Sequence, residues 1–197
     1  MLTKTQIEIM KVFVSKINER FSIKQIADIL EKSYPLIHRS TISLIKDSLL
    51  LKDDKNFISL NYKNNFQTLS YIESLRAGKF LENKTLNLFV KDILNKINND
   101  FFIFLIFGSS VESKEPRDID IIFIVQDKER IIEIERVISN ISSDFSKKFD
   151  INVISSESAY EMFGKRESTN VLNETLNKHI LLFGAENYYR ILKNARQ

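Results

Sequence analysis

The first 63 residues combine three helical patterns with one hairpin pattern. Apolar residues recur three or four positions apart in residues 3–17, 22–30 and 35–50, which is the spacing of one face of an α-helix. The third segment begins at Pro35, and proline suits a first helical turn because its missing N–H would be unpaired there. Residues 49–62 then form two short strand-like stretches around a polar turn, which predicts a hairpin.

The third helix is expected to have one apolar and one polar face. At about 100° per residue, its apolar face is formed by Ile42, Ile45 and Leu49. Its polar face gathers four side chains that suit contacts with the bases and phosphates of a nucleic acid, namely Arg39, Ser40, Ser43 and Lys46. An ordinary solvent-exposed helix has the same pattern, so the sequence leaves both interpretations open.

A further helical pattern follows the hairpin. Residues 64–80 contain no proline, and Gly78 is placed to end the helix. We therefore expect a connecting helix, and not a flexible linker, between a first unit of residues 1–63 and a second unit of residues 81–197.

The second unit opens with a helical pattern over residues 83–100, followed by the apolar run 101–107. A continuous apolar run of this length, with polar residues before it and a glycine after it, is typical of a strand buried on both faces. It ends at Gly108 and Ser109, where the missing Cβ of glycine allows backbone N–H groups to approach an anion closely. The sequence therefore predicts an anion-binding turn after this strand.

Two aspartates begin the next apolar segment, which reads DIDIIFIV from Asp118. Side chains alternate along a strand, so Asp118 and Asp120 share one face while Ile119 and Ile121 share the other. Their Cα atoms are then about 6.5–7 Å apart, and a divalent cation between the carboxylates would remove the cost of burying like charges. A pair of acids at a sheet edge that only repels neighbouring chains is the alternative.

The combination of these two features resembles a known signature. Gly108 and Ser109, a short spacer, and then Asp118-Ile119-Asp120-Ile121 are similar to the motif of the DNA polymerase β-like nucleotidyltransferase superfamily, and residues 81–197 are about the size of its minimal members. The resemblance implies a mixed sheet flanked by helices and an NTP substrate bound through Mg²⁺. It also implies transfer of a nucleoside monophosphate with release of pyrophosphate.

The resemblance also assigns a role to each residue of the motif. Asp118 and Asp120 would ligate two Mg²⁺ ions. The family's third carboxylate lies on a later strand and matches Asp150 in the segment KKFDINVIS, where it would complete the metal site and take up the proton of the acceptor hydroxyl. The phosphates would be held by Gly108 and Ser109, with their charge offset by the spacer residues Lys114 and Arg117.

The order of elements in residues 1–63 resembles a winged helix-turn-helix DNA-binding domain. The resemblance implies that the third helix enters the major groove of duplex DNA with its polar face, while the hairpin contacts phosphates. Winged helices also serve as protein-interaction modules, so a scaffold that recruits a protein is an alternative.

Composition and charge set further limits. The 197 residues carry a net charge of +3, but residues 1–63 hold eleven Lys and Arg against seven Asp and Glu, while the remainder holds eighteen against nineteen. A basic first unit fits a polyanionic partner. The chain has no cysteine, which excludes disulfides and thiolate metal sites. No apolar run approaches the roughly 20 residues of a membrane span, so we expect a cytoplasmic protein without a membrane partner.

The sequence thus predicts an α+β fold with an N-terminal winged helix-turn-helix and a C-terminal mixed sheet flanked by helices. It predicts Mg²⁺-dependent transfer of NMP from an NTP to an acceptor hydroxyl. The sequence does not decide whether this acceptor is a protein, an RNA end or a small molecule. Minimal members of the superfamily often act as antitoxins that modify a toxin. The alternative is a DNA-binding regulator whose nucleotidyltransferase fold senses nucleotide without turnover.

Overall fold

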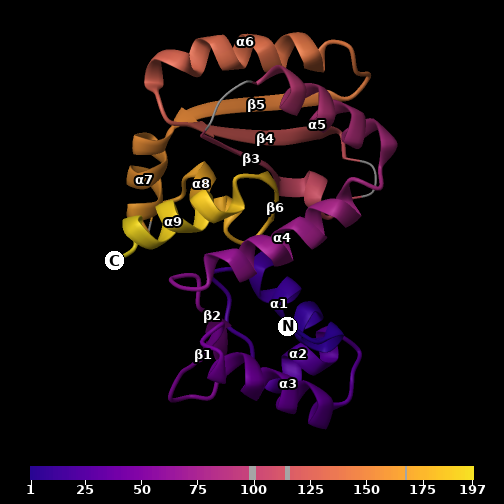
Figure 1. The fold of residues 1–197 in the computed structure, drawn as a ribbon, viewed down its shortest axis with the longest axis vertical. Helices are drawn as coiled ribbons and strands as arrows, with labels where there is room; N and C mark the ends of the chain where they lie inside the picture. Colours follow the sequence, from indigo (N-terminus) through magenta and orange to yellow (C-terminus); the bar gives the residue numbers. More distant parts are fainter. Residues whose placement is uncertain (98–100, 114–115, 167) are drawn as a thin grey trace.

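The fold combines helices with a four-stranded mixed sheet that helices flank, which confirms the α+β class (Figure 1). The computed structural model describes residues 1–97, 101–113, 116–166 and 168–197. Within these ranges, no helix is both long and apolar enough to cross a membrane.

The N-terminal part contains three helices and a hairpin. These elements are α1 (Lys4–Ser15), α2 (Ile23–Ile29), α3 (Tyr34–Lys46), β1 (Leu50–Lys52) and β2 (Ile58–Leu60). Thr3 and Ser22 begin α1 and α2 with capping boxes, in which the hydroxyl and the glutamine three residues later satisfy backbone N–H groups at the helix start. Phe21 pairs with Ile58 through two backbone hydrogen bonds, so the segment before α2 lies along the hairpin.

The connecting helix α4 (Phe66–Phe80) lies within the predicted range 64–80. The expectation that Gly78 ends this helix is wrong, because the helix continues for two more residues. The glycines with positive φ in the described chain are Gly108 and Gly184, so Gly78 does not adopt the left-handed conformation that terminates helices.

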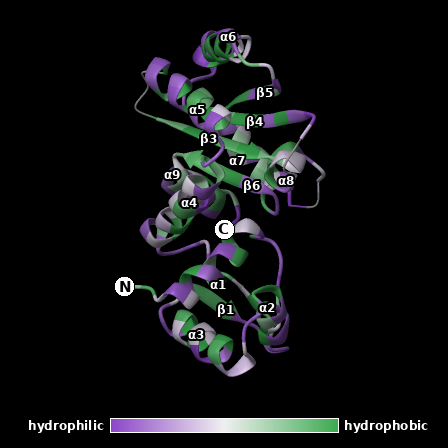
Figure 2. Ribbon diagram, turned by 90° about the vertical axis from the view of Figure 1, so that its right-hand side faces the viewer, coloured by the Kyte–Doolittle hydropathy of each residue, from purple (hydrophilic) through white to green (hydrophobic). Residues whose placement is uncertain are grey.

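The strand order of the main sheet is β5-β4-β3-β6. Its strands are β3 (Phe102–Phe107), β4 (Asp118–Val125), β5 (Lys148–Ser155) and β6 (His179–Phe183). β3 pairs antiparallel with both β4 and β6, whereas β4 and β5 are parallel. Figure 2 shows β3 as hydrophobic throughout and β4 as hydrophilic at one end only, which is the pattern expected from the apolar run and the two aspartates.

Helices cover both faces of this sheet (Figure 1). The remaining elements are α5 (Lys84–Lys96), the 3₁₀ turns η1 (Gly108–Val111) and η2 (Lys128–Arg130), α6 (Ile131–Ser142), α7 (Ser156–Gly164), α8 (Val171–Thr175) and α9 (Ala185–Ala195). On one face, α5 and α6 form a core with Ile119, Ile121 and Phe123 of β4. On the other face, α7, α8 and α9 pack against Ile122 and Ile124.

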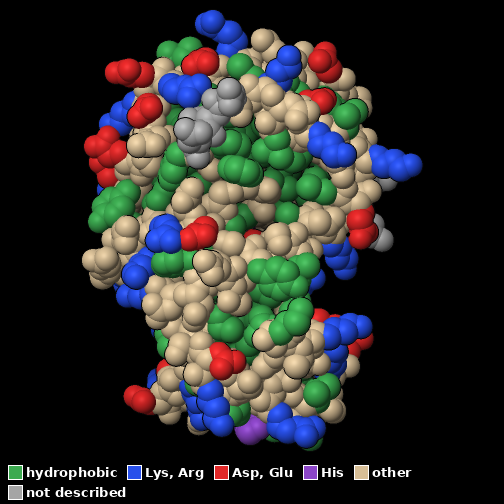
Figure 3. Space-filling view, viewed as in Figure 1, with side chains coloured by type: hydrophobic (Ala, Val, Ile, Leu, Met, Phe, Trp, Pro, Cys, Tyr) green, Lys and Arg blue, Asp and Glu red, His purple; other side chains and the backbone are tan. Residues whose placement is uncertain are grey.

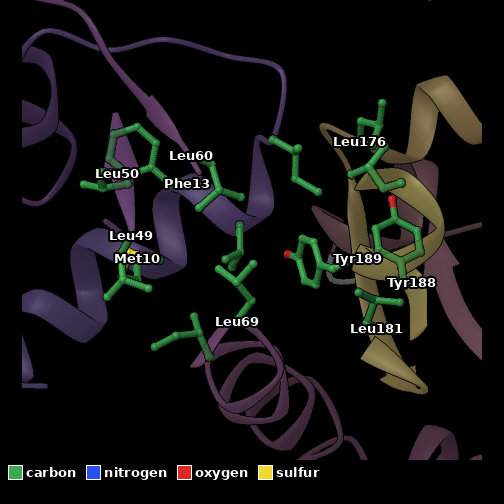
Figure 4. Close-up of a cluster of buried hydrophobic side chains, with 14 of the residues drawn as sticks. Met10, Phe13, Leu49, Leu50, Leu60, Leu69, Leu176, Leu181, Tyr188 and Tyr189 are labelled. Atoms are coloured by element: carbon green, nitrogen blue, oxygen red, sulfur yellow. The ribbon is translucent and has the colours of Figure 1, made fainter. Parts of the chain in front are cut away.

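The second of these cores continues into the N-terminal helices. Figure 4 shows Leu69 of α4 and Tyr189 of α9 where side chains of the N-terminal part meet those of the sheet side. The contact is reinforced by backbone hydrogen bonding, since the N–H of Ile17 donates to the carbonyl oxygen of Leu176 at 2.8 Å. Arg196 also donates to the side-chain oxygen of Asn18 at 2.9 Å.

A buried polar cluster attaches α4 to the sheet. The carboxylate of Glu73 is fully buried and accepts hydrogen bonds from Arg76 at 2.6 Å and from the Tyr189 hydroxyl at 2.8 Å. His179 Nε2 lies 3.2 Å from the same carboxylate, and Nδ1 lies 2.6 Å from the carbonyl oxygen of Thr175. Burial would raise the pKa of Glu73, but Arg76 and His179 outweigh it and hold the pKa below its ordinary value.

Candidate functional site

Three carboxylates lie at the same end of two neighbouring strands. β4 begins at Asp118, and in the parallel ladder with β5 the residue beside Asp120 is Asp150, while Lys148 stands beside Asp118. Aligned residues of adjacent strands project to the same face of a sheet. The structure therefore brings Asp118, Asp120 and Asp150 together on one face, with the two β4 acids half-buried and Asp150 exposed on the edge strand.

The turn after β3 places Gly108 directly against one of these carboxylates. Gly108 has φ +72°, and a Cβ built on it would lie 2.6 Å from Oδ2 of Asp120. Its own N–H donates to the carbonyl oxygen of Lys178 at 3.2 Å, so this group is already used within the fold. Gly108 therefore contributes through its missing Cβ, which leaves room for the Asp120 side chain.

The environment of Asp120 disfavours its ionised form. Burial raises the pKa of Asp120 above its ordinary value, and the charges of Asp118 and Asp150 raise it further. A carboxyl that is destabilised by two like charges gains most from a cation or from a positively charged partner.

The donor set suits Mg²⁺, since this ion prefers carboxylate oxygens. Among the described residues, however, no three His, Cys, Asp or Glu side chains already form a group that could hold a metal ion. The three carboxylates are therefore neighbours on one sheet face without being a preformed cage. Mg²⁺ sites commonly use only one or two protein carboxylates together with phosphate oxygens, and the arrangement fits that kind of site.

The η1 turn presents two serines in different environments. Ser109 is exposed, whereas Ser110 is buried and its hydroxyl donates to the carbonyl oxygen of Phe107 at 2.8 Å. Of the two serine hydroxyls in this turn, the one that faces solvent is therefore that of Ser109. Arg117 is also exposed just before β4, while Lys114 lies outside the described residues.

Two lysines near the site were missed by sequence reasoning. Lys148 is exposed beside Asp118, and only the strand register reveals this, because no motif marks the position. Lys178 forms an ion pair with Glu112 at 3.0 Å and supplies the carbonyl that holds Gly108. Lys148 lies only two residues before Asp150, but its position beside Asp118 depends on the strand register. Lys178 lies outside the signature, in the turn before β6.

The α3 surface differs in part from the expected one. Arg39 and Lys46 are exposed, but Ser40 and Ser43 are half-buried. The Ser43 hydroxyl accepts a hydrogen bond from the Gln6 side chain at 3.0 Å. The expectation of one exposed polar face is therefore corrected: Arg39 and Lys46 are exposed, whereas Ser43 faces α1.

The apolar face of α3 is also rotated from the expected one. The buried side chains of this helix are Ile37, Thr41 and Leu44, while Ile42 and Ile45 are half-buried. Figure 3 shows Lys and Arg side chains at the lower end of the molecule, where α3 lies, as well as over the rest of this face. Arg39 and Lys46 thus stay available for contact with an external polyanion.

Comparisons of this chain with models of protein families, with curated proteins and with solved structures returned no match. The resemblance to the nucleotidyltransferase superfamily therefore rests on the residues of the motif and stays a prediction.

Replacing Gly108 with Ala is expected to lower both activity and stability. The left-handed backbone costs about 1–2 kcal/mol for a residue with a Cβ, and the added methyl group would displace the Asp120 carboxylate that lies 2.6 Å from the Cβ position. We expect the NMP transfer that the sequence predicts to fall by at least about tenfold, since misplacement of a reacting group by about 1 Å has effects of this order or larger.

Gly78→Ala is the matched control for this variant. Nothing lies within 4 Å of a Cβ at Gly78, and an exposed helical Gly-to-Ala change is expected to stabilise by up to about 1 kcal/mol. Thermal unfolding and transfer assays on both variants check the prediction. Wild-type activity of Gly108→Ala would contradict the assigned contact with Asp120.

Proposed function

We propose that the protein is a Mg²⁺-dependent nucleotidyltransferase that moves NMP from an NTP to an acceptor hydroxyl. The observation that carries this proposal is the strand register, which places Asp120 beside Asp150 on the face that Asp118 shares. Three acids near the same end of two parallel strands, next to a glycine turn, are a costly arrangement for a fold to keep without a cationic ligand.

The chain's own residues have distinct roles in this proposal. Bound Mg²⁺ would stabilise the negative charge on the transferring phosphate. Asp118 and Asp120 are the residues that would hold it, and Asp120, whose pKa is raised by burial and by the two other acids, gains most from its binding. Asp150 is exposed on the edge strand, where it can accept the proton of an incoming hydroxyl. The exposed Ser109 hydroxyl and Lys148 ammonium would bind phosphate oxygens.

Transfer of label tests this function directly. The protein is incubated with Mg²⁺ and each α-labelled NTP in turn, with a lysate as the source of acceptors. The expected result is a labelled macromolecule or small molecule together with released pyrophosphate. Labelling of protein, of RNA or of neither would distinguish the three acceptor classes.

We further propose that residues 1–63 form a winged helix-turn-helix that contacts duplex DNA. The pairing of Phe21 with Ile58 adds a third strand-like segment to the β1–β2 hairpin, which supports this class of fold. Arg39 and Lys46 are the exposed cations of α3 that would contact DNA.

The double variant Arg39→Ala, Lys46→Ala is expected to bind duplex DNA more weakly than the wild type. Each lost phosphate contact should reduce the slope of log affinity against log salt by about 1, so the double variant should lose about 2. Lys91→Ala, Lys96→Ala is the matched control, because both lysines are exposed on α5. Equal salt slopes for the two double variants would favour a protein-recruiting role for this unit.

A second candidate function is a DNA-binding regulator that senses nucleotide without turnover. It is favoured by the exposure of Arg39 and Lys46 on α3, which suits DNA binding whether or not a bound nucleotide is turned over. DNA affinity that changes with added NTP, with no label transferred under any condition, would select this function over catalysis.

A further inference from the structure

A cavity of about 890 Å³ lies between the N-terminal part of the molecule and the sheet. It is bordered by α1, the end of α4, the start of α5 and the η1 turn. Asp118, Asp120 and Asp150 are not among its lining residues, whereas Ile119 is. Because Ile119 projects to the opposite face of β4 from the two aspartates, the cavity is separate from the candidate catalytic site.

The wall of this cavity is largely apolar on the side of the sheet. Phe80, Leu86, Ile119 and Ile180 supply aliphatic and aromatic surface. Ile119 and Ile180 are nearly fully buried, and Phe80 and Leu86 pack against the core between the sheet and α5. Such a surface favours a ligand with an apolar body.

Some charged residues that line the cavity form ion pairs, and others do not. Glu8 is paired with Lys32 and Glu112 with Lys178, so two of the lining carboxylates are already neutralised. Within the described residues, Lys11 and Lys79 have no carboxylate within 4.0 Å. Of the acids that line the cavity in this part of the chain, only Glu82 forms no ion pair. Lys147, which donates to the carbonyl oxygen of Pro116, adds a third positive charge, so the rim has a net positive charge.

We propose that this cavity binds a small organic anion with one acidic group and a mainly apolar body. The acidic group would lie between Lys11 and Lys79, and the body would lie against Phe80 and Ile119. The volume lies within the range of about 300–1,000 Å³ that is typical of small-molecule sites. Such a ligand would contact both α1 and the η1 turn that carries Gly108, so its binding connects the N-terminal helices with the candidate catalytic turn.

The fluorescent anion 8-anilinonaphthalene-1-sulfonate is a suitable probe, because it combines one sulfonate with an aromatic body. Titration of the full chain is expected to give saturable enhancement with one bound probe per chain. Lys79→Glu should weaken the affinity by about three- to tenfold, as expected for reversal of one exposed charge. Thr85→Trp, which places a large ring at an exposed lining position, should abolish saturable binding.

Two further variants separate this site from other surfaces. Lys96→Glu reverses an exposed charge outside the cavity and should bind the probe like the wild type. Asp120→Asn should also bind it normally, so the result is independent of whether the protein transfers nucleotides. Unfolding midpoints verify that each variant is folded. The proposal is overturned if the wild type shows no saturable binding, or if Lys79→Glu and Thr85→Trp both titrate like the wild type.

Discussion

Replacing Asp120 with Asn is expected to abolish nucleotidyl transfer. Asp120 has Asp118 two residues before it on β4 and Asp150 beside it on β5. Its carboxylate occupies the space that a Cβ at Gly108 would need. In the proposed function, loss of its charge would remove the central ligand for Mg²⁺. We therefore expect the transfer rate to decrease about a thousandfold or more, equivalent to ~4 kcal/mol of transition-state stabilisation. The rate of label transfer from an α-labelled NTP measures this effect.

The same variant should not be less stable than the wild type at neutral pH. The folded-state pKa of Asp120 is raised by burial and by two like charges, so its ionised form opposes folding at pH values above that pKa, and this cost disappears as the pH falls below the unfolded-state pKa. Asn removes the cost, and the unfolding midpoint at pH 7 should therefore be unchanged or higher. Asp144→Asn, at an exposed position after α6, is the control and should retain full activity. Equal activity of the two variants would refute the proposed site.

Replacing Glu73 with Ala is expected to destabilise the protein by about 3–5 kcal/mol, because removal of one partner leaves buried charge uncompensated. Arg76 and the Tyr189 hydroxyl both donate to this carboxylate, and His179 lies against it. For a chain of this size, about 2–4 °C of unfolding midpoint is lost per kcal/mol, so a decrease of about 10 °C is expected in thermal unfolding at pH 7.

The pH dependence of this loss provides a second measurement. The folded-state pKa of Glu73 is lowered, because Arg76 and His179 outweigh the effect of burial. The carboxylate therefore contributes stability above its unfolded pKa of about 4.3, and the contribution is lost as the pH falls through the folded value. The difference in stability between wild type and Glu73→Ala should therefore narrow as the pH falls below the unfolded pKa of Glu73.

Glu186→Ala is the control for Glu73→Ala, because Glu186 forms an exposed ion pair with Arg190 on α9. Such pairs contribute about 0–1 kcal/mol. A loss for Glu73→Ala no larger than that for Glu186→Ala would show that the buried cluster does not hold α4 to the sheet.

Strand positions in the second unit could be predicted well from the sequence. The apolar run 101–107 became β3 at Phe102–Phe107, and DIDIIFIV became β4 at Asp118–Val125. Side-chain alternation correctly separated the aspartates from Ile119 and Ile121, since the isoleucines enter the core with α5 and α6. These predictions succeeded because a buried strand leaves a continuous apolar signal that few other structures share.

Helix faces and helix ends were predicted less well. The buried side of α3 is centred on Ile37, Thr41 and Leu44, whereas periodicity had favoured Ile42 and Ile45. A helix with apolar residues around much of its circumference does not define its own buried side, which is set here by packing against α1 and α2. The prediction that Gly78 ends α4 was wrong for a similar reason. Contacts with the sheet and with α9 hold α4 in place, and they are not visible in the local sequence.

The sequence by itself determined the positions of β3 and β4 and the face that Asp118 and Asp120 share, because these depend on local alternation, whereas Asp150 was predicted only through the resemblance of the motif. Only the tertiary structure decided that Asp150 stands beside Asp120, that Lys148 stands beside Asp118 and that Glu73 meets His179. These neighbours are separated by 30 residues or by more than a hundred in the chain. Their meeting depends on strand register and helix packing, which are set by the burial of the whole core.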